Sequence, residues 1–293
     1  MATSEESVTS ISELRRLLDS ERQAGHRVGF VPTMGYLHAG HGSLIEAAAA
    51  ESEVVVVSIF VNPLQFAPTE DLSAYPRDLS RDLDLIAASS RTATRVIVFT
   101  PTVEEMYPTS VLTQVSVSGV SESMEGASRP THFAGVATVV AKLFAIVGSC
   151  RAYFGEKDYQ QLAVIRQMAL DLSCPVEVVG CPIVRETDGL ALSSRNVYLT
   201  DSERSAAPVL RRALDEGVRL IGSGVTNADE VRSAVADVIV ASPHADLGYV
   251  EVADPLTLAT VDQISHEVRV FVAARFGRAR LIDNCSASPP PNQ

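Results

Sequence analysis

The chain has 293 residues, of which 46% are apolar, so it is long enough for one large domain or two ordinary ones around a sizeable core. Its formal net charge of −12 produces a field that repels nucleic acid and anionic membranes, although one site can still be locally basic. The longest strongly apolar runs, such as residues 54–61, span about eight residues against the ~20 that a membrane-spanning helix needs, so we expect neither a nucleic-acid partner nor a membrane span.

Helical and strand-like segments alternate through the first 184 residues. Apolar spacing typical of helices recurs at residues 11–21, 42–50, 79–88, 136–147 and 160–172. Short apolar runs, several of them rich in Val and Ile, predict strands at residues 27–31, 53–61, 95–99, from 153 onward and at 176–179. This alternation predicts an α/β domain over residues 1–184, with a parallel sheet covered by helices on both faces.

The pattern changes after residue 184. A polar, irregular stretch at residues 192–199 is followed by helical segments at 202–221 and 228–241 and by strands at 247–252 and 268–274. Helices followed by a separate set of strands predict a smaller α+β domain over residues 185–285. The last segment, 286–293, contains three prolines and is predicted to be a disordered tail.

The N-terminal residues and the cysteines indicate the cellular compartment of the protein. Residues 1–10 carry Glu5 and Glu6 and have neither a basic patch nor an apolar core, so they do not resemble a signal peptide and we expect a cytoplasmic protein. The four cysteines form no C-x-x-C pair, and several lie beside apolar residues. Buried, reduced thiols are therefore favoured over a disulfide framework or a zinc site.

The segment 32–41, PTMGYLHAGH, follows a predicted strand and opens a predicted helix. Ligands of α/β proteins bind at the carboxyl ends of the strands, and the free N–H groups of a helix N-terminus favour phosphate. His38 and His41 can face the same side of the first turn, while Gly35 and Gly40 allow a ligand close to the backbone. Three interpretations stay open: a plain helix cap, a metal pair without an evident third ligand, and an imidazole pair on nucleotide phosphates.

Two other segments could bind a nucleotide, although the sequence contains neither a G-x-x-x-x-G-K-[ST] P-loop nor a G-x-G-x-x-G dinucleotide motif. In the segment 154–161, FGEKDYQQ, a strand ends at Gly155; Lys157 could neutralise a phosphate and Asp158 could accept hydrogen bonds from a ribose. In the segment 192–196, LSSRN, two hydroxyls and a guanidinium could form an anion clamp. Taken alone, the first segment fits a solvated charged turn better than a nucleotide site, and the second fits an ordinary polar linker better.

Two weaker segments complete the set. NPLQF, at residues 62–66, lies just past the second predicted strand and could hold a polar substrate through the amide of Gln65. RPTHFAG, at residues 129–135, is a loop that enters a long apolar helix. Four of the five segments follow predicted strands or enter helices, so they could lie on one rim of a single sheet.

Together these segments resemble the pantothenate synthetase (pantoate–β-alanine ligase) family. The matching segments, in chain order, are VPTMGYLHAGH, VSIFVNPLQF, DLSAYPRD, EEMYP, RPTHFAGV, FGEKDYQQL, VRETDGLALSSRN and RLIDN. They extend from residue 31 to residue 284, and their order and combination are highly specific. The HxGH motif alone marks only the wider nucleotidyl-transferring superfamily.

The resemblance implies a Rossmann-like N-terminal domain, a smaller C-terminal lid and a homodimer. It also implies ATP-dependent joining of pantoate to β-alanine, with Mg²⁺ carried by ATP and no dedicated metal ligand. Gln65 and Gln161 would hold the pantoate hydroxyls, with Gln65 also near β-alanine. The residues implied to contact ATP are Met34, Gly35, Tyr36, Leu37, His38, Ala39, Gly40, His41, Gly155, Glu156, Lys157, Asp158, Val184, Leu192, Ser193, Ser194 and Arg195. The implied catalytic residues among them are His38, His41 (as a proton donor), Lys157, Ser193, Ser194 and Arg195.

Three positions depart from the family pattern. Ala39 stands where Glu is frequent, Gly42 where Leu is usual, and Leu192 where Met or Lys is usual. A glycine in the first turn weakens a helix slightly, and Leu192 cannot make an ionic contact through its side chain. These changes affect the expected reaction rate and substrate affinity more than the assignment to the family.

A mechanism and two rival functions follow. Pantoate's carboxylate is ionised at neutral pH, so its attack on the α-phosphate of ATP needs stabilised negative charge rather than a general base. The product would be a pantoyl adenylate, which β-alanine then attacks. The rivals are a nucleotidyltransferase of the same superfamily, which would keep the nucleotide in its product, and a non-catalytic nucleotide-binding protein.

Overall fold

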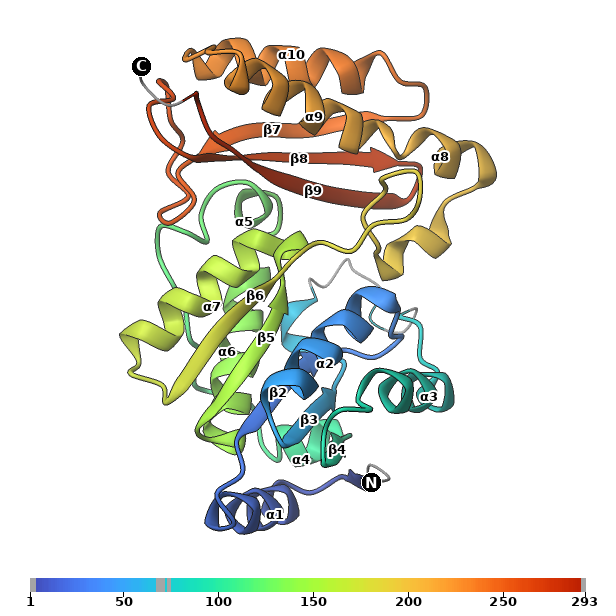
Figure 1. Ribbon diagram of the computed structural model, residues 1–293, viewed down its shortest axis with the longest axis vertical. Coiled ribbons are helices and arrows are strands. Elements are labelled where there is room, and N and C mark those ends of the chain that lie inside the picture. The colour runs from blue at the N-terminus through green and yellow to red at the C-terminus, as the bar shows by residue number, and fades with distance from the viewer. Residues whose placement is uncertain (1–3, 67–71, 73–74, 291–293) are drawn as a thin grey trace.

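Two sheets, each with its own helices, are stacked along the long axis of the molecule (Figure 1). The computed structural model describes residues 4–66, 72 and 75–290. The first sheet has six strands and the second has three. None of the helices in the described part of the chain combines the length and apolar content that crossing a bilayer requires.

The six-stranded sheet is parallel throughout and has the strand order β1-β4-β3-β2-β5-β6. Its strands are β1 (Ser4–Val8), β2 (Val28–Thr33), β3 (Val54–Ile59), β4 (Arg95–Phe99), β5 (Cys150–Gly155) and β6 (Val176–Cys181). From β2 the chain proceeds to β3 on one side, and from β5 it proceeds to β6 on the other. The sheet therefore has a topological switch point between β2 and β5, where open α/β sheets bind their ligands.

Helices cover both faces of this sheet, as the sequence predicted. Helices α1 (Ile11–Gln23), α6 (His132–Val147) and α7 (Tyr159–Asp171) pack on one face, and α2 (Ala39–Glu51) and α3 (Leu79–Ser89) pack on the other. Successive strand residues alternate between the two cores: Val54 and Val56 join the first, and Val55 and Val57 the second. The near-continuous run of valines reflects this burial of both faces.

The second sheet is antiparallel and consists of β7 (Asp246–Ala253), β8 (Val268–Phe276) and β9 (Ala279–Ala287). Helices α9 (Val209–Gly222) and α10 (Ala228–Val240) cover its outer face (Figure 1). The predicted helical segment 202–221 is interrupted: α8 (Asp201–Ala206) ends and α9 begins after Pro208, which has no N–H to continue the ladder. The predicted α/β class with a smaller α+β domain is thus confirmed.

Two strands, β1 and β9, form where the sequence pattern predicted none. β1 has the polar sequence SEESV and pairs only with β4, at the edge of the first sheet. β9 carries the motif RLIDN and includes Ser286 and Ala287, two residues that we assigned to the tail; residues 291–293 lie outside the described part. The domain boundary at residue 184 stays a prediction; the last strand of the first sheet, β6, ends at Cys181.

The inner face of the second sheet packs on the carboxyl end of the first domain. Phe271 of β8 contacts Tyr159 of α7, with ring centroids 6.0 Å apart. Arg269 of β8 stacks over the same ring at 3.6 Å. Arg280 of β9 forms an ion pair of 2.7 Å with Glu125 of α5 (Glu125–Ser128). The C-terminal sheet therefore covers the strand ends at which a ligand would bind.

Gly135 lies where two segments pack closely at these strand ends. A β-carbon on Gly135 of α6 would lie 2.2 Å from the carbonyl oxygen of Leu64 and 2.7 Å from the α-carbon of Gln65, in η1 (Pro63–Gln65). We predict that Gly135→Ala lowers the free energy of unfolding by roughly 1–3 kcal/mol, measured by urea denaturation, because η1 must move. Gly222→Ala is the matched control, since nothing lies within 4 Å of that β-carbon. It should be neutral or stabilise by up to ~1 kcal/mol, and equal effects of the two substitutions would contradict the close packing.

Candidate active site

A cleft of about 790 Å³ lies between the carboxyl ends of the parallel strands and the C-terminal sheet. Direct pairing of β2 with β5, at Gly29–Arg151 and Phe30–Ala152, brings the loops that follow these two strands together. The predicted strand 27–31 continues as β2 through Pro32 to Thr33, past its last pairs with β5. The two strands therefore separate toward their ends, where the cleft begins.

The structure brings together most of the residues that the sequence analysis selected. Those that line the cleft are Met34, His38, Gly40, His41, Gln65, Gly155, Lys157, Asp158, Gln161, Val184, Leu192, Ser193, Ser194 and Arg195. Gly35, Tyr36, Leu37, Ala39 and Glu156 do not line it. Among the second group, Leu37 is fully buried and the carboxylate of Glu156 pairs with Arg269 at 3.3 Å. Their roles, like those of the first group, stay predictions.

Asp82 shapes the loop between β2 and α2. Its buried carboxylate, in α3, accepts hydrogen bonds from the N–H groups of Tyr36 (2.9 Å) and Leu37 (2.6 Å). Gly35 and Tyr36 have φ angles of 84° and 51°, a left-handed conformation that is unusual for tyrosine. Because the carboxylate binds two successive N–H groups, it holds the turn in this conformation. The sequence analysis did not select Asp82, which lies 41 residues beyond the motif (82 against 41).

The two histidines cap the helix that follows. His38 is the N-cap residue of α2, and its Nδ1 accepts a hydrogen bond from the N–H of Gly40 at 3.1 Å. The Nδ1 of His41 accepts one from the N–H of His38 at 3.3 Å, and the ring centroids lie 4.2 Å apart. A β-carbon on Gly40 would lie 2.9 Å from the His38 ring, so this packing requires glycine at position 40.

This capping decides the protonation of both imidazoles. A ring nitrogen that accepts an N–H hydrogen bond carries no proton, so in the neutral ring the proton is on Nε2. Burial, and then the charge of Lys157, lowers the pKa of His38 to about 4. Burial, and then the neighbouring His38, lowers the pKa of His41 to about 3. At neutral pH each uncharged ring therefore keeps one donor, Nε2–H, for a ligand in the cleft, while Nδ1 serves the helix.

The loop after β5 places a cation opposite these rings. In η2 (Glu156–Asp158), the Nζ of Lys157 lies 3.3 Å from a carboxylate oxygen of Asp158. Burial alone would raise the pKa of Asp158, but Lys157 and Arg195 outweigh it, so this pKa is lowered. Asp158 therefore stays ionised beside the two cations.

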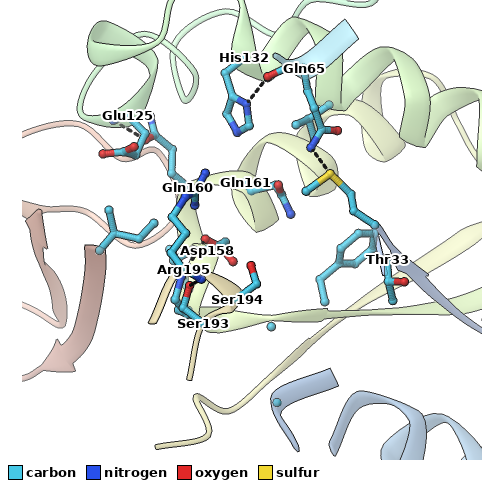
Figure 2. Close-up of a pocket in the computed structure, with 18 of the residues that line it drawn as sticks. Thr33, Gln65, Glu125, His132, Asp158, Gln160, Gln161, Ser193, Ser194 and Arg195 are labelled. Carbon is cyan, nitrogen blue, oxygen red and sulfur yellow. Dashed lines mark hydrogen bonds and ion pairs between the residues drawn. The ribbon is translucent and has the colours of Figure 1, made fainter. Parts of the chain in front are cut away.

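Residues 192–195 meet the same loops from the other side. A β-carbon on Gly40 would lie 3.8 Å from that of Leu192, which shows how close this segment lies to the start of α2. Ser193 caps η3 (Ser194–Tyr198) by accepting a hydrogen bond from the N–H of Arg195 at 3.2 Å. Figure 2 shows Ser193, Ser194 and Arg195 beside Asp158 in the cleft.

Of the predicted substrate amides, Gln65 lies away from Ser193, Ser194 and Arg195, and Gln161 lies between them and Gln65 (Figure 2). Gln65 receives a hydrogen bond from Asn62 (3.2 Å) and donates one to the sulfur of Met34 (2.8 Å). Gln161 lines the cleft, whereas the buried neighbour Gln160 uses its amide on the backbone of Val120, Ser123 and Glu125. Gln65 and Gln161 thus face the cleft from two different elements, while Gln160 supports the wall.

The cleft is locally basic in spite of the chain's negative charge. The cationic residues that line it are Arg129, Lys157, Arg195, Arg275, Arg278 and Arg280, and the acidic ones are Glu125, Asp158 and Asp283. Within the described residues, no group of three or more His, Cys, Asp or Glu side chains is arranged to hold a metal ion. The arrangement suits a polyanionic ligand bound by N–H donors and cations.

Several known proteins resemble this chain over nearly its whole length. The family model described as pantoate–β-alanine ligase matches residues 6–286. A pantothenate synthetase of Sinorhizobium medicae is 52% identical over 283 residues, which are 96% of each chain. The crystal structure of pantothenate synthetase from Thermus thermophilus superimposes with a TM-score of 0.89 at 50% identity, covering 96% of this chain and 98% of the other. A pantoate–β-alanine ligase from Francisella tularensis, complexed with βγ ATP and β-alanine, has a TM-score of 0.78 at 33% identity, with 96% and 97% covered.

The lowered pKa values of the histidines predict a loss of stability in acid. An unfolded histidine titrates near pH ~6.5, whereas the folded values are about 4 for His38 and about 3 for His41. Between these limits the unfolded chain binds protons that the folded chain does not, so stability falls as the pH falls below ~6.5.

His41→Gln removes one of these titrations, and glutamine at this position can still accept the capping hydrogen bond. We expect the variant to lose less stability than the unchanged protein between pH 7.5 and pH 5, measured by urea denaturation at both values. Parallel losses in the two proteins would contradict the burial of a neutral imidazole.

Proposed function

The chain belongs to the pantoate–β-alanine ligase family and joins pantoate to β-alanine, and we propose that it does so through a pantoyl adenylate formed in the cleft between the two sheets. One observation carries the proposal: the pairing of β2 with β5, which brings His38 and His41 to the same cleft as Lys157. The arrangement fits a triphosphate, because the positive end of the α2 dipole, two imidazole N–H donors and an ammonium group converge there.

ATP would lie across the switch point with its phosphates at the start of α2. The Nε2–H groups of His38 and His41 would donate to phosphate oxygens, and Lys157 would neutralise charge on them. Asp158 is ionised and would accept hydrogen bonds from the ribose. Mg²⁺ would arrive with ATP as part of the substrate and shield the outer phosphates, since this ion keeps most of its ligands as water and phosphate.

This geometry favours a hydrogen-bonding role for the histidines over the proton-donor role that the resemblance implies for His41. A group whose pKa lies near 3 holds no extra proton to release at neutral pH. A neutral imidazole can still stabilise charge that builds on phosphate, because its N–H is already oriented by the bond at Nδ1. We propose that both rings act in this way.

Pantoate would occupy the neighbouring part of the cleft. The amides of Gln65 and Gln161 are suited to its two hydroxyls, since each amide both donates and accepts. The pantoate carboxylate then attacks the α-phosphorus, the bond from that phosphorus to the bridging oxygen breaks, and pyrophosphate leaves. Ser193, Ser194 and Arg195 lie where they could bind the departing phosphates.

The second step makes the amide. The uncharged amine of β-alanine attacks the acyl carbon of the adenylate, the bond from that carbon to the phosphate oxygen breaks, and AMP leaves. The new amide nitrogen releases one proton to water. The cover formed by the C-terminal sheet would limit hydrolysis of the adenylate by excluding water. We also propose, as the resemblance implies, that residues 185–285 act as a lid and that the enzyme is a cytoplasmic homodimer.

The adenylate predicts a partial reaction. Radiolabelled pyrophosphate should exchange into ATP when pantoate is present and β-alanine is absent, because the first step is reversible. A nucleotidyltransferase would instead yield a nucleotide conjugate, and a non-catalytic binder would bind ATP without turnover. Release of free AMP together with pantothenate, but no pantoate-dependent exchange, would remove the adenylate from the mechanism.

Lys157 is predicted to stabilise phosphate charge, and Lys157→Ala should lower turnover by a factor of roughly 10² or more. The chain offers a matched control, because its one other lysine, Lys142, lies outside the cleft and over the ring of Tyr107 at 5.4 Å. Lys142→Ala should change turnover by less than about threefold, because this side chain does not line the cleft. A loss below tenfold for Lys157→Ala would limit this residue to a structural role.

A further inference from the structure

Asn284 connects the C-terminal sheet to the backbone of the Lys157 loop. Its side-chain Nδ2 donates two hydrogen bonds, to the carbonyl oxygens of Glu156 (2.9 Å) and Lys157 (3.0 Å). These carbonyls belong to η2, 127 and 128 residues away along the chain. Both donors of the amide are therefore spent on one turn of the opposite domain, at Lys157, which lines the cleft.

The amide of Asn284 is buried and oriented from its other end. Its Oδ1 accepts a hydrogen bond of 2.5 Å from Arg269, and 2% of the residue is exposed. Arg269 is itself fixed by stacking on Tyr159 and by its ion pair with Glu156. Since a guanidinium only donates and a carbonyl only accepts, the amide can take just one orientation here.

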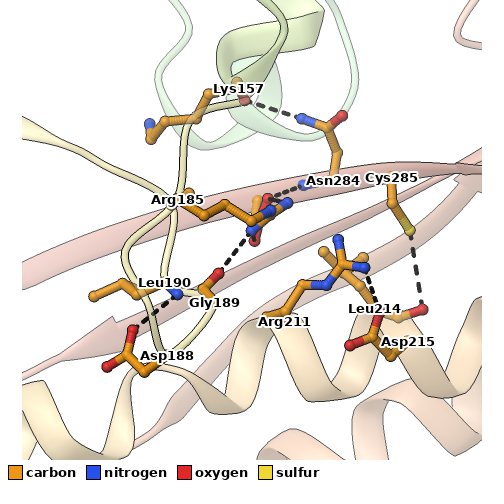
Figure 3. A network of polar contacts seen from close by, with 12 residues as sticks. Lys157, Arg185, Asp188, Gly189, Leu190, Arg211, Leu214, Asp215, Asn284 and Cys285 are labelled. Atoms are coloured by element: carbon orange, nitrogen blue, oxygen red, sulfur yellow. Dashed lines mark hydrogen bonds and ion pairs between the residues drawn. The ribbon is translucent and has the colours of Figure 1, made fainter. Parts of the chain in front are cut away.

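The neighbouring residue of β9 connects to the second phosphate-facing segment. Asp283 forms a two-bond ion pair with Arg185 at 2.6 and 2.9 Å and accepts a hydrogen bond from the N–H of Asn284 at 2.8 Å. Figure 3 shows Arg185 and Asn284 in one network with Lys157. Arg185 begins the segment that leads to residues 192–195, and its bridge with Ala191 closes that segment into a loop. Strand β9 thus anchors both segments.

We propose that Asn284 is a positioning residue for nucleotide binding, acting through Lys157. The inference rests on the proposed function in that Lys157 is the group that meets the triphosphate. A turn of three residues such as η2 has few hydrogen bonds of its own, so the two external donors decide where its backbone lies. A displacement of about 1 Å at a charged contact can cost up to 10²-fold in rate.

The test compares three variants of the full chain. Asn284→Ala removes both donors. Asn284→Asp keeps the shape of the side chain and can still accept from Arg269, but its carboxylate cannot donate to the carbonyl oxygens of Glu156 and Lys157. Ser286→Ala is the matched control, because this residue lies two positions along the same strand and its hydroxyl bonds Glu267 within the C-terminal domain. Urea denaturation of each variant establishes that it is folded.

The primary measurement is calorimetric titration with MgATP alone, and the second is pantothenate formation with separate KM values for ATP and pantoate. Asn284→Ala and Asn284→Asp should weaken ATP binding by about tenfold or more, whereas the KM for pantoate should change by less than about threefold. Ser286→Ala should match the unchanged protein in both. If the alanine variant does not fold, the aspartate variant alone decides.

A double-mutant cycle separates positioning from general support. In a Lys157→Ala background, the Asn284 substitutions should weaken ATP binding by less than about threefold, because the group they position is gone. Equal losses in both backgrounds, or ATP binding by Asn284→Asp at the unchanged affinity, would overturn the inference. If the unchanged protein binds ATP but forms no pantothenate, the proposed function is refuted, and the ATP titrations of the variants still decide the role of Asn284. If the unchanged protein does not bind ATP, the proposed function and the Asn284 inference are both refuted.

Discussion

The pairing of β2 with β5 is the constraint on which the candidate site depends. These strands are separated by more than 115 residues, yet in the sheet they are neighbours with a parallel register at Gly29 and Phe30. Their carboxyl ends then diverge, and the segments that follow them face each other across the gap. An imidazole pair and an ammonium group therefore share one cleft, which neither segment could form alone.

Electrostatics and burial work together in this cleft. The chain carries a net charge of −12, but within its described residues the cleft where the strands end is lined by six cationic residues and three acidic ones. Two nearby imidazoles in such a place would repel Lys157 if they were charged. Their low pKa values remove that repulsion and leave N–H donors, which could bind the proposed phosphate without the cost of burying further cations. The helix cap and the ligand site thus use opposite nitrogens of the same rings.

Buried polar side chains give the cleft its shape. Asp82 holds the turn before α2, Asn62 holds Gln65, and Asn284 holds the loop of Lys157. Each is almost fully buried, so an unmade hydrogen bond would cost about 1–3 kcal/mol. That cost favours one conformation of each loop, and it explains how irregular segments hold reactive groups in place. Asp82 and Asn284 hold loops from other elements, whereas Asn62 is the N-cap of η1, the turn that contains Gln65.

The sequence by itself determined the α/β class, because periods of two and of 3.6 residues are local properties of the chain. It also determined which polar segments follow strands, and its resemblance to one family identified the function. The tertiary structure alone decided that β2 lies beside β5, that Asp82 supports the motif, and that β9 exists as a strand. Strand order depends on contacts between distant residues, which periodicity does not record. β9 was not predicted because Asp283 and Asn284 interrupt its apolar pattern. These two buried polar residues are stable in a strand because they pair with Arg185, 98 residues away, and with Arg269, which lies 15 residues away on β8.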